Sequence, residues 1–93
     1  MNYKEIVEGI KSLKIQGAEK IAVAAVEAFA LKLKETQDPN LLQDGEQELV
    51  ATRPTEPALR NALKYCLMNY QKNPDVAAYV INYFKEAKEK IAE

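Results

Sequence analysis

The sequence contains no histidine, no tryptophan, one cysteine (Cys66), three glycines and four prolines. Without histidine, a Ser-His-Asp or Cys-His catalytic arrangement is excluded, because its base is missing. The same absence argues against a zinc or copper site, and a single cysteine forms no internal disulfide. We therefore expect this chain to hold no catalytic residue, no metal and no cofactor.

The chain also lacks an excess of charge of one sign and a long apolar run. Its 13 Lys and Arg against 14 Asp and Glu argue against direct binding of nucleic acid, which needs clustered positive charge. The most apolar stretch, residues 21–33, contains Glu27 and Lys32 and is too short to span a membrane. The N-terminus lacks the apolar core of a signal peptide. We expect one cytoplasmic domain covering residues 1–93.

Helical periodicity is the main pattern that is present. Apolar residues recur every three to four positions, and no segment alternates as a strand would. The sequence therefore predicts an all-α fold, a compact bundle of four to five helices. The predicted helices cover residues 3–13, 18–34, 39–51, 56–71 and a last segment that begins at Asn73-Pro74.

The predicted helix boundaries depend on a few capping residues. Gly17 is a natural break before the second helix, and Thr55 is a candidate N-cap for the fourth. The third helix either starts at Pro39 with Asp38 as its N-cap or begins only near Asp44. The second helix is apolar on most sides, which is typical of a helix covered from several directions. We expect it to form the centre of the bundle.

Two segments carry a resemblance to a known family. Residues 10–22, Ile-Lys-Ser-Leu-Lys-Ile-Gln-Gly-Ala-Glu-Lys-Ile-Ala, resemble the stretch of sugar-phosphate isomerases in which a first helix ends in Arg-Gly-Ala and an Ala-rich helix follows. Residues 51–62, which begin Ala-Thr-Arg-Pro-Thr, resemble the family's Ala-Arg-Pro-Thr motif and the next helix. The family contains ribose-1,5-bisphosphate isomerase, methylthioribose-1-phosphate isomerase and the alpha, beta and delta subunits of translation initiation factor 2B.

The resemblance implies that this chain corresponds to the family's N-terminal helical domain. In the family a larger Rossmann-like domain follows and carries the catalytic Cys and Asp, and nothing in this sequence corresponds to it. Cys66 does not match that cysteine, because it lies on the apolar face of the fourth helix, where we expect a buried structural thiol. The expected partners are such a C-terminal domain or other protein subunits.

The resemblance also implies a phosphate contact at each motif. Gly17 and Ala18 open a helix, where free N–H groups and the helix dipole favour an anion. Arg53, held by the rigid Pro54, would add a charge-assisted contact. Gln16 stands where the isomerases usually have Arg, and it can donate a hydrogen bond but supplies no charge. The candidate phosphate-binding residues, for a sugar phosphate or a nucleotide, are Gln16, Gly17, Ala18 and Arg53.

Structural interpretations of both motifs stay open. Gly17 could serve only to end the first helix, and Arg53 could pair with a nearby Glu beside a proline corner. The neutral Gln16 favours a non-catalytic, factor 2B-like domain that serves assembly and protein contacts. The alternative is the helical cap of a sugar-phosphate isomerase, contributing substrate phosphate contacts. A third interpretation is an unrelated helical adaptor.

Overall fold

The computed structural model of the chain describes the backbone of residues 2–92 and the side chains of residues 2–86. Within this part all regular secondary structure is helical, which confirms the predicted all-α fold. The Cα atoms have a radius of gyration of 12.5 Å, as expected for a compact bundle. The five helices are α1 (Tyr3–Lys11), α2 (Ala18–Glu35), α3 (Pro39–Thr52), α4 (Pro57–Asn69) and α5 (Val76–Ala92).

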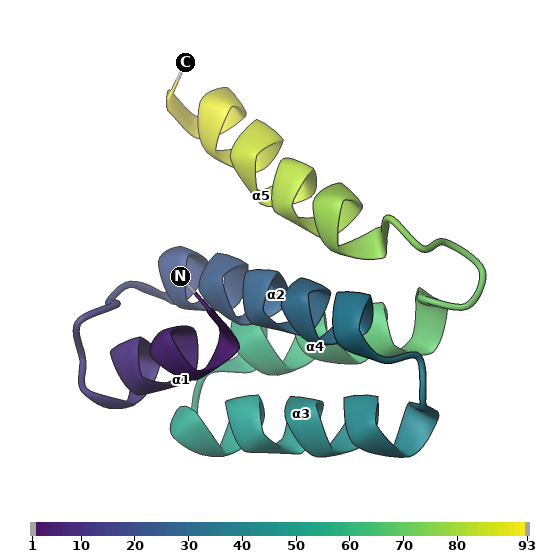
Figure 1. The fold of residues 1–93 in the computed structure, drawn as a ribbon. Coiled ribbons are helices and arrows are strands. Elements are labelled where there is room, and N and C mark those ends of the chain that lie inside the picture. Colours follow the sequence, from purple (N-terminus) through teal and green to yellow (C-terminus); the bar gives the residue numbers. More distant parts are fainter. Residues whose placement is uncertain (1, 93) are drawn as a thin grey trace.

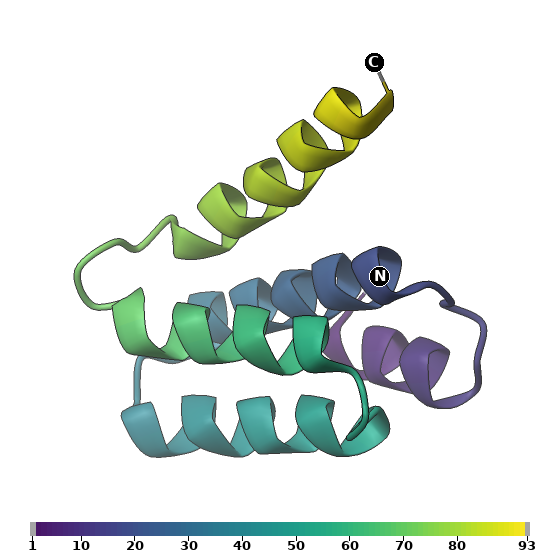
Figure 2. The same cartoon turned by 180° about the vertical axis from the view of Figure 1, so that it is seen from behind.

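The helix α2 is the centre of the arrangement, as its apolar circumference predicts. It contacts each of the other four helices. The helices α2, α3 and α4 lie side by side and alternate in direction, while α1 packs against α2 and α3 (Figures 1 and 2). The helix α5 contacts α2 and α4 and leans away from the bundle toward its C-terminal end. This lean leaves part of α5 without a neighbouring helix.

Small residues are prominent among the buried residues of α2. Ala22, Ala25 and Ala28 are fully buried, and short side chains of this kind allow neighbouring helices to approach closely. Larger side chains from several helices complete the core, and each such buried Leu or Phe contributes roughly 1.5–3 kcal/mol. The largest of these fully buried residues include Phe29, Leu42, Leu49, Leu59 and Leu63.

The sequence left two possible starts for α3, at Pro39 or near Asp44, and the structure confirms the first. Asp38 is the N-cap, and its side chain accepts a hydrogen bond of 2.9 Å from the backbone N–H of Asn40. Pro39 occupies the first helical turn, where its missing N–H has no cost. The helix therefore begins at Pro39 and not near Asp44.

The prediction that Thr55 caps the fourth helix is wrong. Glu56 is the N-cap of α4, and no side chain caps this helix. Pro57 is the reason, because a residue that precedes proline is pushed out of the helical region, and Glu56 has φ −99° and ψ 98°. The backbone N–H of Glu56 instead closes a turn onto the carbonyl of Arg53 at 3.1 Å.

The first and last helices also differ from their predicted boundaries. The helix α1 ends at Lys11, two residues before Leu13, which has a positive φ of 69°. The helix α5 begins at Val76 and not at Asn73-Pro74. The Asn73 side chain accepts a hydrogen bond of 3.0 Å from the N–H of Asp75, and this local turn delays the helix.

Candidate functional site at the start of α2 and the end of α3

The start of α2 presents backbone donors that are open to a ligand. Gly17 is the N-cap with φ 92° and ψ 131°, and no side chain caps the helix. The first hydrogen bond into the helix runs from the N–H of Ile21 to the carbonyl of Gly17 at 2.9 Å. The N–H groups of Ala18, Glu19 and Lys20 therefore have no partner within α2. A Cβ added at Gly17 would meet no atom within 4 Å, so this turn is not packed against other residues.

The loop before α2 excludes one interpretation of Gly17. The helix α1 is ended by Ser12 and Leu13, since the N–H of Ser12 bonds to the carbonyl of Glu8 at 2.9 Å and Leu13 turns left-handed. Gly17 lies beyond this turn and begins the next helix, so the idea that it only terminates α1 is wrong. The Gln16 side chain donates a hydrogen bond of 2.9 Å to the carbonyl of Leu13, which shows a structural role for this exposed amide.

Arg53 lies at the end of α3 and is half-buried. Its backbone N–H bonds to the carbonyl of Val50 at 3.1 Å. Its side-chain Nε is buried and has no hydrogen-bond partner in the part of the chain that the structure describes. A buried donor without a partner costs about 1–3 kcal/mol, so an acceptor from a ligand or another polypeptide would be stabilising here.

The topology brings the two motifs to one end of the bundle. The helices α2 and α3 are antiparallel neighbours joined by a three-residue link, so the start of α2 and the end of α3 lie at the same end (Figures 1 and 2). Gly17 caps the first of these ends and Arg53 the second. A shared anion site of Gln16, Gly17, Ala18 and Arg53 stays a prediction. Glu19 in the first turn of α2 opposes an anion there, because its carboxylate repels negative charge.

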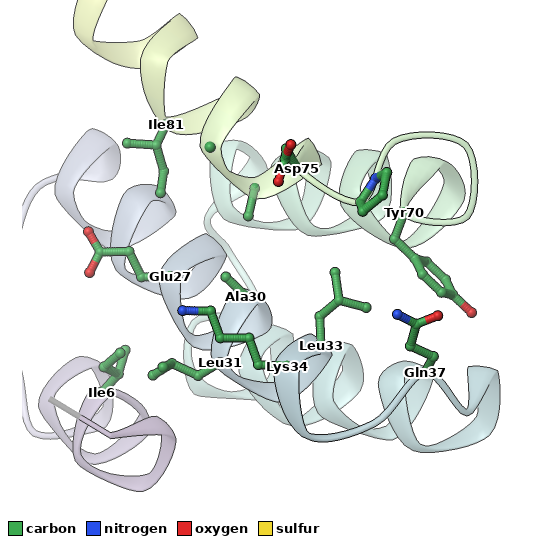
Figure 3. Close-up of a pocket in the computed structure, with 13 residues that line it drawn as sticks. Ile6, Glu27, Ala30, Leu31, Leu33, Lys34, Gln37, Tyr70, Asp75 and Ile81 are labelled. Atoms are coloured by element: carbon green, nitrogen blue, oxygen red, sulfur yellow. The ribbon is translucent and has the colours of Figure 1, made fainter.

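A groove of about 700 Å³ lies along a different part of the molecule, between α2 and α5. Figure 3 shows Ile81 of α5 pointing toward α2 across this groove, and Leu33 and Tyr70 line it farther along. Charged residues of both signs, Glu27, Lys34 and Asp75, line it. None of the four candidate phosphate-binding residues belongs to this groove.

A second groove, of about 430 Å³, separates α4 from α5 and is lined mainly by aromatic and small residues. Three exposed tyrosines of its walls, together with Met68 three residues after Tyr65 on α4, make up a surface that we call the aromatic face: Tyr65, Met68, Tyr79 and Tyr83. Sequence reasoning missed this surface. The residue spacing could have revealed it. Tyr79 and Tyr83 are four residues apart, and Tyr65 and Met68 are three residues apart, so each pair lies on one side of its helix.

Cys66 is fully buried, as expected for a structural thiol. Burial raises the pKa of this thiol to about 11, so the group stays protonated and unreactive at neutral pH. Within the described residues, no three or more potential ligands among Cys, Asp and Glu gather into a metal site. None of the described helices combines the length and the apolar character needed to cross a membrane.

The chain is thus a small helical domain in which hydrogen-bond donors from two motifs, at the start of α2 and at Arg53, have no partner within the described residues. The chain is similar to proteins named ribose 1,5-bisphosphate isomerase. It is 37% identical to that of Methanocaldococcus jannaschii over 76% of this chain and 25% of the relative. It is 32% identical to that of Pyrococcus furiosus over 91% of this chain and 29% of the relative. A methylthioribose-1-phosphate isomerase of Anaeromyxobacter is 39% identical over 55% of this chain and 15% of the relative.

These matches confirm the resemblance to the sugar-phosphate isomerases of this family. The chain spans about a quarter of the length of the archaeal relatives it matches. No protein-family profile matches it. No solved structure matches it either.

Proposed function

We propose that this chain is a helical cap of a sugar-phosphate isomerase and contributes contacts to a substrate phosphate. The observation that carries this proposal is the pair of unsatisfied donor sets at one end of the bundle. The first set is the free N–H groups at the start of α2, and the second is the buried Nε of Arg53 at the end of α3. The isomerase names of the matched relatives support a sugar phosphate as the ligand.

The two donor sets suit the chemistry of a phosphate. Backbone N–H groups at a helix start and the positive end of its dipole attract an anion. A guanidinium adds charge and directed hydrogen bonds, which match the geometry of phosphate oxygens. The absence of a side chain at Gly17 leaves the approach to α2 open. Proton transfer during isomerisation needs a positioned acid and base, which in this proposal come from residues outside this chain.

The isolated chain should bind phosphate weakly. Hydrogen bonds to charged groups contribute about 1.5–3 kcal/mol each, and the few that are available correspond to a dissociation constant on the order of a millimolar. Gln16 adds no charge, and its side chain already binds the carbonyl of Leu13. Glu19 further weakens the attraction.

NMR titration of the 93-residue chain with inorganic phosphate tests the proposal. The amide signals of Gly17, Ala18 and Arg53 should shift first, and Arg53→Ala should remove most of the response. The matched control is Arg60→Ala, since Arg60 is exposed on α4 and the chain has no other arginine. Phosphate-induced shifts that survive Arg53→Ala, or that respond equally to Arg60→Ala, would contradict the proposed site.

A charge variant within α2 gives an independent check. Glu19→Gln removes a negative charge from the first turn without changing the size of the side chain. The affinity for phosphate should rise about two- to fivefold, because one such charge at a helix start is worth about 0.3–1 kcal/mol. An unchanged affinity would place the anion away from the start of α2.

A second candidate is a non-catalytic, factor 2B-like domain that acts in assembly and protein contacts. The observation that favours it is Gln16, a neutral residue that serves the loop before α2. The variant Gln16→Arg separates the two candidates. If the bundle end binds phosphate, the added charge should raise the affinity at Gly17 and Ala18. If wild type and Gln16→Arg both show no phosphate response, the factor-like role is favoured.

A further inference from the structure

The aromatic face is an apolar surface on α4 and α5, and three of its four members, Tyr65, Tyr79 and Tyr83, line the groove between these helices. Tyr65 of α4 and Tyr79 of α5 stack across the groove, with ring centroids 6.1 Å apart and an angle of 20° between the rings. One turn farther along α5, Tyr83 lies edge-on to Phe84, with centroids 6.0 Å apart. These contacts hold the rings in place, so little side-chain freedom is left to lose when a partner binds.

These side chains are unusually exposed for their size. The exposed fractions are 45% for Tyr65, 70% for Met68, 55% for Tyr79 and 63% for Tyr83. The other large exposed hydrophobic residues in the described part of the chain, Leu13 and Leu41, lie on other elements. Single exposed apolar residues are ordinary, whereas a contiguous patch marks an interaction surface.

The charge distribution favours a second copy of this chain as the partner. In a two-fold symmetric dimer the same patch meets itself, so any charge near the axis faces a charge of its own sign. The groove between α4 and α5 has no charged lining residue. The groove between α2 and α5, by contrast, is lined by Glu27, Lys34 and Asp75. Of these two grooves, the one between α4 and α5 can therefore meet its own copy without bringing charged lining residues of the same sign together.

The available area is consistent with a weak dimer. Large side chains of this kind bury about 150–250 Å² when fully covered, so four that are about half exposed offer roughly 400 Å² per copy. A standard interface buries about 800 Å² per partner, and the rest would have to come from the flanking surfaces of α4 and α5. Interfaces at the low end of the size range are typically weak and transient, so we expect a dissociation constant no tighter than about the micromolar range.

We propose that two copies of this chain associate through the aromatic face, with α4 and α5 of one copy packed on α4 and α5 of the other. In this dimer, two helices from each copy form the interface, and the stacked Tyr65 and Tyr79 of each copy lie near its centre. The contact also covers a side of α5, the helix that leans away from its own bundle.

Sedimentation equilibrium of the 93-residue chain tests this proposal. Between about 5 μM and about 1 mM the mean mass should rise from 10.5 kDa toward twice that value, as mass action requires. The double variant Tyr79→Lys, Tyr83→Lys should stay monomeric over the same range, because two copies would bring four positive charges together. Circular dichroism and thermal unfolding establish that the variant is folded, which is expected because both rings are more than half exposed.

Two control variants make the result specific to this face. Leu41→Lys changes an exposed apolar residue on α3, and Ala78→Lys changes an exposed residue that lines the groove between α2 and α5. Both should associate like the unmodified chain. A chain that is monomeric throughout the range overturns the proposal, as does association that survives the double tyrosine variant. Loss of association in Ala78→Lys alone would also overturn it, since the contact would then lie on the other side of α5.

Discussion

The hydroxyl of Tyr3 in α1 donates a hydrogen bond of 2.5 Å to the carboxylate of Glu48 in α3. The same hydroxyl lies 3.4 Å from the carbonyl of Gly45. The ammonium of Lys32 in α2 stands 4.9 Å from the centroid of the Tyr3 ring, within the range of a cation–π contact. One tyrosine near the N-terminus thus joins three helices through polar contacts at the edge of the core.

Loss of this hydroxyl should lower the free energy of unfolding. Tyr3→Phe keeps the ring and its contact with Lys32 but removes the bond to Glu48, with an expected cost of about 1 kcal/mol for a charge-assisted bond at a partly exposed site. Urea unfolding at neutral pH measures the change. Lys4→Ala, which alters an exposed residue of the same helix, should have a much smaller effect.

The same contact should make stability depend on alkaline pH. Burial is the largest of the causes that raise the pKa of Tyr3 well above the ordinary 10.0. The hydrogen bond to Glu48 and the negative charge of the Glu48 carboxylate raise this pKa further. A raised pKa in the folded state means that its contribution is present below pH 10 and is lost as the pH rises beyond that value. Cys66 titrates in the same direction, so Tyr3→Phe should flatten the profile most clearly in a Cys66→Ala background. An equal slope with and without the hydroxyl would show that Tyr3 ionises normally.

Two glycines should respond oppositely to alanine. Gly17 has φ 92°, which costs about 1–3 kcal/mol for a residue with a side chain, although nothing would clash with its Cβ. Gly45 lies within α3, and a Cβ there meets Tyr3 and Lys32 at 3.6–3.8 Å, which is ordinary contact. Gly45→Ala should therefore stabilise the chain by about 0.5–1 kcal/mol. Thermal unfolding of both variants checks the opposite signs.

Replacing Leu13 with glycine should increase the stability of the folded chain. Its φ of 69° is left-handed, a conformation that costs a residue with a side chain about 1–2 kcal/mol. Its side chain is half exposed, so little packing is lost on its removal. Leu13→Gly should raise the free energy of unfolding by up to about 1 kcal/mol, after the larger backbone entropy of glycine in the unfolded chain is subtracted. A destabilised variant would mean that the Leu13 side chain packs in solution.

A charge in the centre of α2 should prevent stable folding. Ala25 is fully buried, and Ala25→Glu would place an unpaired carboxylate in the core at a cost of several kcal/mol. Ala18→Glu, the same substitution at an exposed position of the same helix, is the matched control. Circular dichroism should show an unfolded or strongly destabilised Ala25→Glu chain and a folded control. Equal melting temperatures would reject the central position of α2.

Most of the fold follows from local sequence, because the signals that mark these helices act over a few residues. The Asp38-Pro39 pair starts α3 in the structure as its chemistry predicts, since a side-chain cap and a fixed φ both act locally. The N-cap of α4 was missed because Thr55 has the preferred side chain but Pro57 decides which residue leaves the helical region. Leu13 could not be predicted to turn left-handed, because its side chain gives no preference for that conformation.

The sequence by itself determined the helical class, the central place of α2 and the two motifs that relate the chain to its family. Apolar periodicity and helix caps carry this information, and both are written in neighbouring residues. Only the tertiary structure decided that Tyr3 reaches Glu48, that Arg53 Nε is buried without a partner among the described residues, and that Tyr79 and Tyr83 stay more than half exposed. These relationships depend on how whole helices are oriented, and that orientation results from packing among residues far apart in the chain.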